Sequence, residues 1–426
     1  MYSLNRSARP FVNSFLFGAV FNAIALQWTN IFVGSIPWII LFCGQAVLFM
    51  PLGFAKKYGI GFYPFIFLIM EQVRSLFPFG GFGWLRLAYS QADAPYSQIA
   101  AIGGASALST LALLIAFVLY SLLNSRFTLL PLLPLALLFI PVHLENVGSI
   151  RAVMIQGNVA KLGLDFNERA TEVFFNHVLE TKRALALDKS VDFILWPENA
   201  VDVDPFTNTK VREALNSFDQ TMIIGAVIRK NQELLNTSIM WQRTSQNIYV
   251  KQHLTPFGEY IPLRAIASKI SPYADSVEDF TPGSSSKVFT LNGAKIAPII
   301  CFELLDDGVV ANAARDSQLL VVQTNSATFG KSSENAQQLA ITRIRAIEYG
   351  RNILSVSTTG VSAFIDYRGK IQMLTKPHQS AHLFVQPGLL EGQTPRDKAG
   401  DWTLIGALIW LLTCAREKRA RFKYRR

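Results

Sequence analysis

Hydrophobic positions are distributed unevenly along the 426-residue chain. Long apolar runs with few charges fill residues 11–143 and return at 402–414, whereas residues 147–390 mix apolar and polar positions as a globular domain does. Apolar runs of about 20 residues predict helices that cross a bilayer. We therefore expect a membrane domain of about five transmembrane helices over 1–146, a globular domain over 147–390, and a last transmembrane helix with a basic tail over 391–426.

The positions of the basic residues predict the orientation of these spans. Arginines and lysines precede the first span and follow the second, the fourth and the last. With six spans, all of these clusters lie on one face, which the positive-inside rule makes cytoplasmic. The globular domain follows an odd number of crossings, so we expect it on the extracytoplasmic side. The expected spans are 11–28, 31–55, 60–78, 105–124, 127–143 and 402–415, of which the fifth is short and contains three prolines.

The globular segment alternates between strand-like and helix-like patterns. Short runs of β-branched and apolar residues predict strands, and apolar residues at a helical period predict helices. Their alternation, with several strands in hairpin-like succession, predicts a layered α/β domain and not a simple doubly wound sheet. The expected strands are 152–156, 193–196, 222–228, 237–242, 247–250, 295–300, 319–323, 353–357, 362–366 and 370–374, and the expected helices are 166–187, 209–217, 304–315 and 335–349.

Composition and charge favour the membrane over other partners. Only 16% of the residues are charged, against about a quarter in soluble proteins, and the mean hydropathy is +0.27. The net charge of +10 arises mostly in residues 416–426, which directly follow an apolar run. A basic cluster in this position is typical of a cytoplasmic anchor at anionic lipid. We expect a membrane partner and no nucleic acid.

Three reactive side chains lie where predicted strands end. Glu198 follows one strand, Lys251 follows a second, and Cys301 follows a third. Each has a structural explanation when taken alone, as a strand end, an edge lysine or a buried thiol. Together, a carboxylate, an ammonium and a thiol at one rim of a sheet are suited to thiol-based acyl chemistry. We expect Glu198 to take the thiol proton, Lys251 to stabilise negative charge as a cation, and Cys301 to attack.

Three further residues are candidates for supporting this chemistry. The backbone N–H of Phe302 is placed to act as an oxyanion donor. Glu259 and Glu303 could each hold Lys251 charged and oriented, and either could equally be a helix-start or surface carboxylate. The five histidines show no metal-ligand spacing, so we predict neither a metal nor a cofactor.

Several segments resemble the carbon–nitrogen hydrolase (nitrilase) superfamily and, within it, the apolipoprotein N-acyltransferase family. The segments that carry the resemblance are Trp196-Pro197-Glu198, Cys301-Phe302-Glu303, and residues 83–91, 251–262, 324–330 and 343–351. The resemblance implies an αββα sandwich inserted between helices of a membrane bundle. It also implies Glu198 as the general base, Lys251 as the electrostatic stabiliser and Cys301 as the nucleophile, with Glu259 and Glu303 as supporting acids.

The resemblance further implies the reaction and its place. Cys301 would take an acyl chain from a phospholipid as a thioester, and the α-amine of a diacylated prolipoprotein would then attack that thioester. The enzyme would be a multi-pass monomer of the bacterial plasma membrane with its catalytic domain outside. The family typically has about eight spans, and the two that this chain lacks map to the N-terminus. Two alternatives are a membrane-tethered nitrilase-type amidase and an inactive lipoprotein-binding scaffold, against which the complete triad argues.

Overall fold

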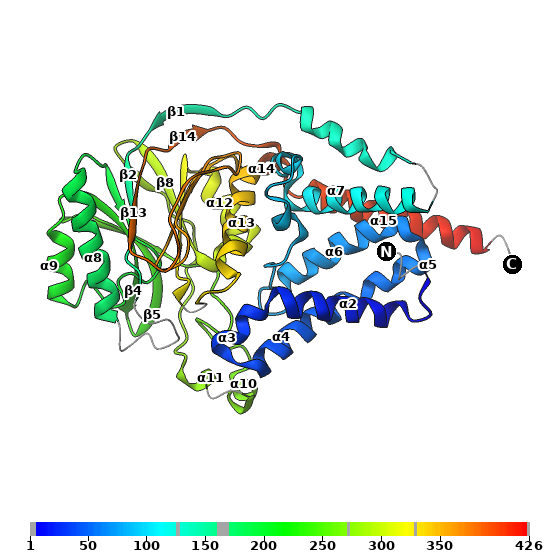
Figure 1. Ribbon diagram of the computed structural model, residues 1–426, viewed down its shortest axis with the longest axis horizontal. Helices are drawn as coiled ribbons and strands as arrows, with labels where there is room; N and C mark the ends of the chain where they lie inside the picture. The colour runs from blue at the N-terminus through cyan, green and yellow to red at the C-terminus, as the bar shows by residue number, and fades with distance from the viewer. Residues whose placement is uncertain (1–5, 125–127, 160–169, 271–272, 328–329, 424–426) are drawn as a thin grey trace. The chain divides into compact units, whose positions relative to one another are not determined.

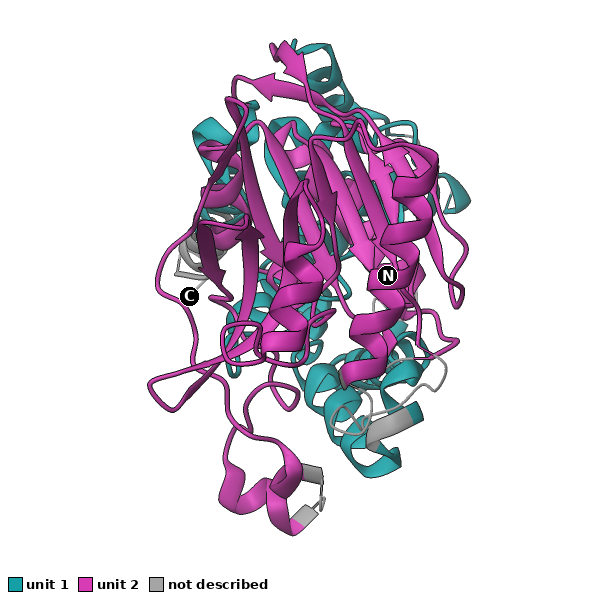
Figure 2. Ribbon diagram, turned by 90° about the vertical axis from the view of Figure 1, so that its left-hand side faces the viewer, with its two compact units in different colours: residues 1–142, 394–426 teal, residues 143–393 magenta. Residues whose placement is uncertain are grey.

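The computed structural model describes residues 6–124, 128–159, 170–270, 273–327 and 330–423, and the chain divides into two compact units (Figure 2). Unit 1 comprises residues 1–142 and 394–426, and unit 2 comprises residues 143–393. The start of the helix expected over 166–187, the end of the basic tail and two residues of the motif at 324–330 lie outside the described residues.

Unit 1 is helical, and its apolar helices differ in length. Among the described residues, Ser35–Tyr58 and Ser97–Leu123 are long and apolar enough to cross a membrane. The expected bundle of six spans is therefore not confirmed. The helices of unit 1 are α2 Pro10–Ala25, η1 Gln27–Thr29, α3 Asn30–Val33, α4 Ser35–Val47, η2 Met50–Gly53, α5 Phe54–Tyr58, η3 Ile60–Phe62, α6 Tyr63–Leu76, η4 Leu87–Gln91, η5 Ser97–Ile99, α7 Ala100–Leu123, η6 Leu130–Phe139, α14 Pro395–Ala399 and α15 Trp402–Lys423, where η marks a 3-10 helix.

Helices in several of the expected spans are shorter than predicted. The third contains α6, whose 14 residues rise about 21 Å at 1.5 Å per residue. The fifth contains η6, a 10-residue 3-10 helix that reaches about 20 Å, short of the ~30 Å hydrocarbon core. Pro131 and Pro134 explain the short fifth helix, because proline lacks the N–H that an α-helix needs.

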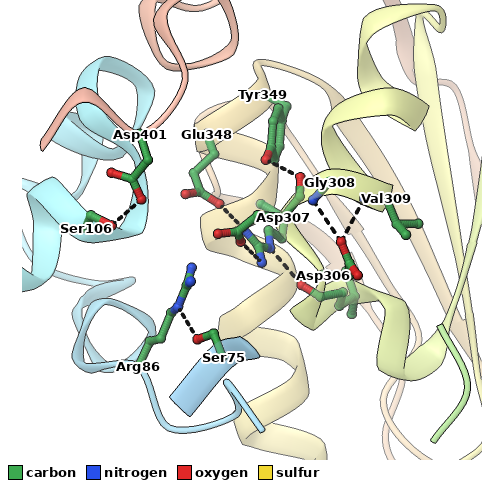
Figure 3. Close-up of polar contacts among 12 residues, drawn as sticks. Ser75, Arg86, Ser106, Asp306, Asp307, Gly308, Val309, Glu348, Tyr349 and Asp401 are labelled. Carbon is green, nitrogen blue, oxygen red and sulfur yellow. Dashed lines mark hydrogen bonds and ion pairs between the residues drawn. The ribbon is translucent and has the colours of Figure 1, made fainter. Parts of the chain in front are cut away.

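Elsewhere in unit 1, the hydroxyl of Ser106 on α7 donates to Asp401 at 2.6 Å, next to the start of α15 (Figure 3).

Unit 2 contains the strands and the remaining helices. The strands are β1 Glu145–Ser149, β2 Ala152–Gln156, β3 Phe193–Leu195, β4 Thr221–Lys230, β5 Glu233–Trp241, β6 Gln246–Val250, β7 Phe289–Leu291, β8 Ala294–Ile300, β9 Leu319–Thr324, β10 Asn352–Ser357, β11 Ala363–Ile365, β12 Ile371–Leu374, β13 Ala381–Val385 and β14 Gly388–Glu391. The helices are α8 Ala170–Leu187, α9 Thr209–Asn216, α10 Arg264–Ile270, α11 Tyr273–Ser276, η7 Cys301–Leu305, α12 Asp307–Arg315 and α13 Glu334–Tyr349.

Two six-stranded mixed sheets form the centre of unit 2. One sheet has the order β13-β2-β3-β4-β5-β6 and the other β12-β11-β10-β9-β8-β7. Figure 1 shows α8 and α9 outside the first sheet and α12 and α13 outside the second. The layers therefore follow one another as helix, sheet, sheet and helix, which confirms the nitrilase-like layered α/β fold that we expected.

Strand β2 shows how the layers are held together. Val153 and Ile155 pack into the core beneath the outer helices, and Ala152 and Met154 pack into the core between the sheets. Successive strand side chains point to opposite faces, so a strand with two buried faces must be apolar throughout. This requirement explains the continuous apolar run at 152–156.

The parallel strands of each sheet place the candidate residues at strand ends. β3 pairs in parallel with β2 and β4, and β9 pairs in parallel with β8 and β10. Glu198 follows the end of β3, and Cys301 follows the end of β8. One expectation needs correction, because the helix predicted over 304–315 is divided into η7 and α12. Asp306 causes the break, since its carboxylate accepts from the N–H groups of Gly308 and Val309 and caps α12 (Figure 3).

Candidate active site

Lys251 follows β6, and its ammonium lies between two carboxylates. Its Nζ is 3.2 Å from Oε1 of Glu198 and 2.8 Å from Oε2 of Glu259, and only 1% of the residue is exposed. Burial by itself lowers the pKa of Lys251, but the negative charges of Glu198, Glu259 and Cys301 outweigh burial and raise this pKa. Lys251 is therefore a fixed cation and not a base.

Asn236 joins the two carboxylates from the neighbouring strand. Its Nδ2 donates to Oε1 of Glu198 at 2.9 Å and to Oε1 of Glu259 at 2.6 Å. The N–H of Lys251 in turn donates to the carbonyl oxygen of Asn236, because β5 and β6 pair in antiparallel register. Asn236 was not among the residues predicted from the sequence. The sequence does show an amide inside an apolar strand. A buried amide must find hydrogen-bond partners, and this requirement could have indicated Asn236.

The second carboxylate, Glu259, contacts Lys251 as the sequence suggested. It also accepts the N–H of Thr255 at 2.7 Å. Burial raises the pKa of Glu259, but the ion pair with Lys251 and the hydrogen bonds from Asn236 and Thr255 lower it further than burial raises it. Glu259 is therefore a carboxylate that holds Lys251 in place.

The turn that carries Glu198 is fixed from the opposite sheet. The carbonyl oxygen of Trp196 accepts from Gln323 on β9 at 2.7 Å, and that of Glu198 accepts from the hydroxyl of Thr358 at 3.3 Å. The backbone of β4 approaches the same turn closely at Gly225. A Cβ atom there would lie 2.3 Å from the carbonyl oxygen of Pro197, so the position requires glycine. Both sheets thus position Glu198.

Cys301 occupies a turn between β8 and η7. Its φ of 49° is in the left-handed region, which is unfavourable for a residue with a Cβ. Two contacts hold the turn: Oε2 of Glu303 accepts the N–H of Ile300 at 2.7 Å, and Nε of Arg345 donates to the carbonyl oxygen of Leu304 at 2.7 Å. The turn is therefore determined by its surroundings on both sides of the thiol.

Protein groups surround the sulfur of Cys301. Nε2 of Gln338 donates to it at 3.6 Å, and the backbone N–H of Asn325 also donates to it. Burial is the largest cause that raises the pKa of the Cys301 thiol, followed by the charge of Glu198, while Lys251 opposes them. The raised pKa keeps the thiol protonated near neutral pH, so use of this sulfur as a nucleophile would require a base.

Glu303 has a different position from Glu259. It is fully buried, and its Oε1 accepts from the hydroxyl of Tyr249 at 2.7 Å and from the N–H of Gln252 at 2.6 Å. Its hydrogen bonds connect the turn of Cys301 to the segment around Lys251, but within the described residues the ion pairs of Lys251 are those with Glu198 and Glu259. Burial raises the pKa of Glu303, and these hydrogen bonds oppose the rise.

Phe302 and Arg345 also lie close to the turn that carries Cys301. The ring of Phe302 is buried beside the ring of His253, with their centroids 5.5 Å apart. Arg345 forms ion pairs of 2.6 Å with both Glu348 and Asp307 (Figure 3 shows both carboxylates). The role of the Phe302 N–H as an oxyanion donor stays a prediction.

Glu198, Lys251 and Cys301 lie on a helix–sheet–sheet–helix domain that falls within the class of carbon–nitrogen hydrolases. The family profile described as "Carbon-nitrogen hydrolase" matches residues 158–383, more than half of the chain. The profile described as "Apolipoprotein N-acyltransferase N-terminal domain" matches residues 1–118.

Curated relatives identify the branch of this class. A protein of Mycolicibacterium smegmatis named "Apolipoprotein N-acyltransferase" is 33% identical over 90% of this chain and 73% of its own length. A protein of the same name from Haemophilus influenzae is 26% identical over 96% of this chain and 86% of its own length. A solved CN-hydrolase superfamily protein from Xanthomonas campestris is 16% identical over 56% of this chain and 90% of its own length, with a TM-score of 0.42. The chain belongs to the apolipoprotein N-acyltransferase family and is an acyltransferase.

Proposed function

We propose that this enzyme moves an acyl chain from a phospholipid to the α-amine of a diacylglyceryl-cysteine at the N-terminus of a lipoprotein. The observation that carries the proposal is the buried Lys251 between Glu198 and Glu259, in electrostatic contact with the thiol of Cys301. The acyl acceptor follows from the family, whose curated members are named for apolipoprotein N-acylation.

In the first half-reaction, Glu198 takes the proton of the Cys301 thiol as sulfur attacks the ester carbonyl of the phospholipid. Lys251 and the Phe302 N–H stabilise the oxyanion that forms. The bond between the carbonyl carbon and the glycerol oxygen then breaks, and Glu198 returns the proton to that oxygen. The products are a thioester on Cys301 and a lysophospholipid.

In the second half-reaction, the lipoprotein amine attacks the thioester carbonyl. The carbon–sulfur bond breaks, an amide forms, and Glu198 passes a proton from nitrogen to the sulfur of Cys301. A nitrilase-type amidase would use water at this step. The acyltransferase is the better supported function, because the relatives share both the catalytic unit and the N-terminal helical domain.

The surface of unit 1 supports a location in a membrane. Apolar side chains point outward on several helices, while polar side chains lie inside. Many large apolar side chains on the surface, together with polar side chains in the interior, suit a lipid environment. We infer a monomeric multi-pass protein of the bacterial plasma membrane with unit 2 outside. Representative outward apolar residues are Val20, Ile24, Ile40, Ile405 and Leu412, and representative buried polar residues are Asn22, Gln45 and Ser109.

Mass spectrometry of the purified protein with phospholipid tests the reaction. We expect a fatty-acyl mass on Cys301 that disappears when a diacylglyceryl-cysteine peptide is added. The variant Cys301→Ala gives no adduct, and Lys251→Met forms it at least about a hundredfold more slowly. Loss of the acyl group to water at an equal rate with and without the peptide would contradict the proposal.

A further inference from the structure

Glu334 is a buried carboxyl group with an unused oxygen. It lies in the first turn of α13, only 1% of the residue is exposed, and the Ser326 hydroxyl hydrogen-bonds to its carboxyl group. Its Oε2 is buried and has no hydrogen-bond partner among the described residues. A buried polar atom without a partner costs free energy, so this oxygen is available to a hydrogen-bond donor that enters the site.

Two independent contacts place Glu334 beside the sulfur of Cys301. Gln338, which donates to that sulfur, lies one helical turn after Glu334 on the same face of α13. Ser326, which bonds the carboxyl group of Glu334, directly follows Asn325, whose N–H also donates to the sulfur. The charge of Glu334 acts on both Cys301 and Glu198.

The two half-reactions require different numbers of proton acceptors. In the first, one proton moves from the Cys301 thiol through Glu198 to the leaving oxygen, so one carboxylate is enough. In the second, an α-ammonium becomes an amide nitrogen and loses two protons. One of these protons returns to the sulfur through Glu198, and the other needs a second acceptor.

We propose, on the basis of the function proposed above, that Glu334 is this second acceptor and binds the α-ammonium of the incoming lipoprotein. The Oε2 of Glu334 takes one proton from nitrogen, which leaves a neutral amine and a carboxylic acid. The amine lone pair then forms the bond to the thioester carbon, the carbon–sulfur bond breaks, and Glu198 transfers the second proton to sulfur. Glu334 releases its proton to solvent after the amide leaves.

The acid–base properties of Glu334 fit this role. Burial raises the pKa of Glu334 to about 8; the hydrogen bond from Ser326 opposes the rise, and the charge of Glu198 adds to it. The pKa of an α-amino group is about 7.7–8.0. Proton transfer between two groups of similar pKa is nearly balanced, and the arriving cation favours the ionised carboxylate. Among the described residues, the titratable groups that interact electrostatically with Glu334 are Glu198 and the thiol of Cys301.

Separate measurement of the half-reactions tests the proposal. Full-length wild type, Glu334→Gln and Glu334→Asp are loaded with acyl chain from phospholipid, and acyl-Cys301 is followed by intact mass. The loaded proteins then receive either a diacylglyceryl-cysteine peptide or hydroxylamine, which is uncharged at neutral pH and has one proton fewer to lose. Glu213→Gln, which changes an exposed glutamate on α9, is the matched control.

We expect Glu334→Gln to acylate Cys301 within about threefold of the wild-type rate and to transfer to the peptide about a hundredfold more slowly. Transfer to hydroxylamine stays within about threefold, and the peptide reaction of the variant recovers as pH rises and deprotonates the amine. The rate of transfer to the peptide in Glu334→Asp, which keeps a carboxylate, should lie between the rates of wild type and Glu334→Gln.

Three results for Glu334→Gln would overturn the role of Glu334. They are an equal loss of rate in both half-reactions, an equal loss of transfer rate with both nucleophiles, or no loss of rate in either half-reaction. If Glu334→Gln does not fold, a Glu334→Asp variant that loses as much with hydroxylamine as with the peptide overturns it as well. Failure of the proposed function itself has a different signature, because wild-type protein would then form no acyl-Cys301 or would lose its acyl group only to water.

Discussion

Arg345 donates a hydrogen bond of 2.7 Å to the carbonyl oxygen of Leu304, three residues after Cys301. The guanidinium is fully buried and also pairs with Glu348 and Asp307. One side chain therefore joins the first helical turn after Cys301 to α12 and α13. A planar group with several fixed donors can make all of these contacts, whereas a single ammonium cannot.

The variant Arg345→Lys tests this connection. We expect the free energy of unfolding to fall by about 1.5–3 kcal/mol, because charged hydrogen bonds are lost in a buried site. We also expect acyl-Cys301 to form roughly tenfold more slowly, because the nucleophile turn loses a support. Urea titration and intact mass spectrometry measure the two effects. Arg315→Lys on the exposed face of α12 is the control, and equal behaviour of the two variants would argue against the role of Arg345.

The variant Asn236→Asp tests the amide that joins Glu198 and Glu259. The substitution keeps the shape of the side chain but places a third carboxyl group against two others. Like charges raise the pKa of such a cluster, so Glu198 is less available as a base near neutral pH. Acyl-enzyme formation should therefore fall about a hundredfold at neutral pH and partly recover at higher pH, where the carboxyl groups ionise. The rate of acylation against pH measures the shift. Asn247→Asp, at an exposed position of β6, should leave the profile unchanged.

The variant Gly225→Ala tests the close approach of β4 to the Glu198 turn. The new Cβ would lie 2.3 Å from the carbonyl oxygen of Pro197 and 2.6 Å from Cα of Glu198. We expect a loss of about 1–3 kcal/mol in the free energy of unfolding and slower acylation, because the base must shift. Gly61→Ala is the control, since its Cβ would meet no atom within 4 Å. A rate of Cys301 acylation equal to that of wild type in Gly225→Ala would contradict this prediction, because it would show that the Glu198 turn can shift without loss.

Because His177 is buried, we expect the free energy of unfolding to depend on pH. The ring is fully buried against Trp196, and burial lowers the pKa of His177 to about 4, although contacts with Val173 and Glu180 oppose the change. Its ordinary pKa is about 6.5. Below pH 6.5 the unfolded chain therefore binds a proton that the folded protein does not bind until about pH 4. The stability contributed by neutral His177 is present above pH 6.5 and is lost as the pH falls toward 4.

This loss reaches about 3 kcal/mol, at ~1.4 kcal/mol for each pKa unit. Urea unfolding at several pH values measures it. In His177→Gln the decline between pH 6.5 and 4 should be smaller by this amount, whatever the stability of the variant at neutral pH. His143→Gln, at an exposed position, should keep the wild-type slope. Equal slopes in all three proteins would contradict the prediction.

The sequence predicted the elements of the central core well, because strands buried on both faces must be apolar along their length. The strand expected at 152–156 has the same bounds in the structure. Four strands were missed: β1, β7, β13 and β14. β1 is exposed throughout, β7 has three residues, and β13 is an edge strand that is mostly half-buried, so each has a weak hydrophobic pattern. The order of strands within each sheet cannot be obtained from these local patterns.

For the site, the sequence indicated which reactive groups follow strands, and on that basis it predicted Glu198, Lys251 and Cys301 as the catalytic residues. It could not distinguish Glu259, which contacts Lys251, from Glu303, which holds backbone groups, because both are carboxylates near the same segments. Asn236 and Glu334 were not selected. An asparagine in a strand and a glutamate at a helix start are ordinary locally, and their importance depends on neighbours that are distant in the sequence.

The chain by itself determined which chemical groups are available: a thiol, carboxylates, an ammonium, and the apolar segments that indicate lipid. These are properties of residue type and of short-range order, so they can be obtained without coordinates. The tertiary structure alone decided which charges meet. It brought Glu198 and Glu259 to one ammonium and placed Glu334 beside the thiol, because pKa values and ion pairs depend on burial and on distances of a few ångströms between residues far apart in the chain.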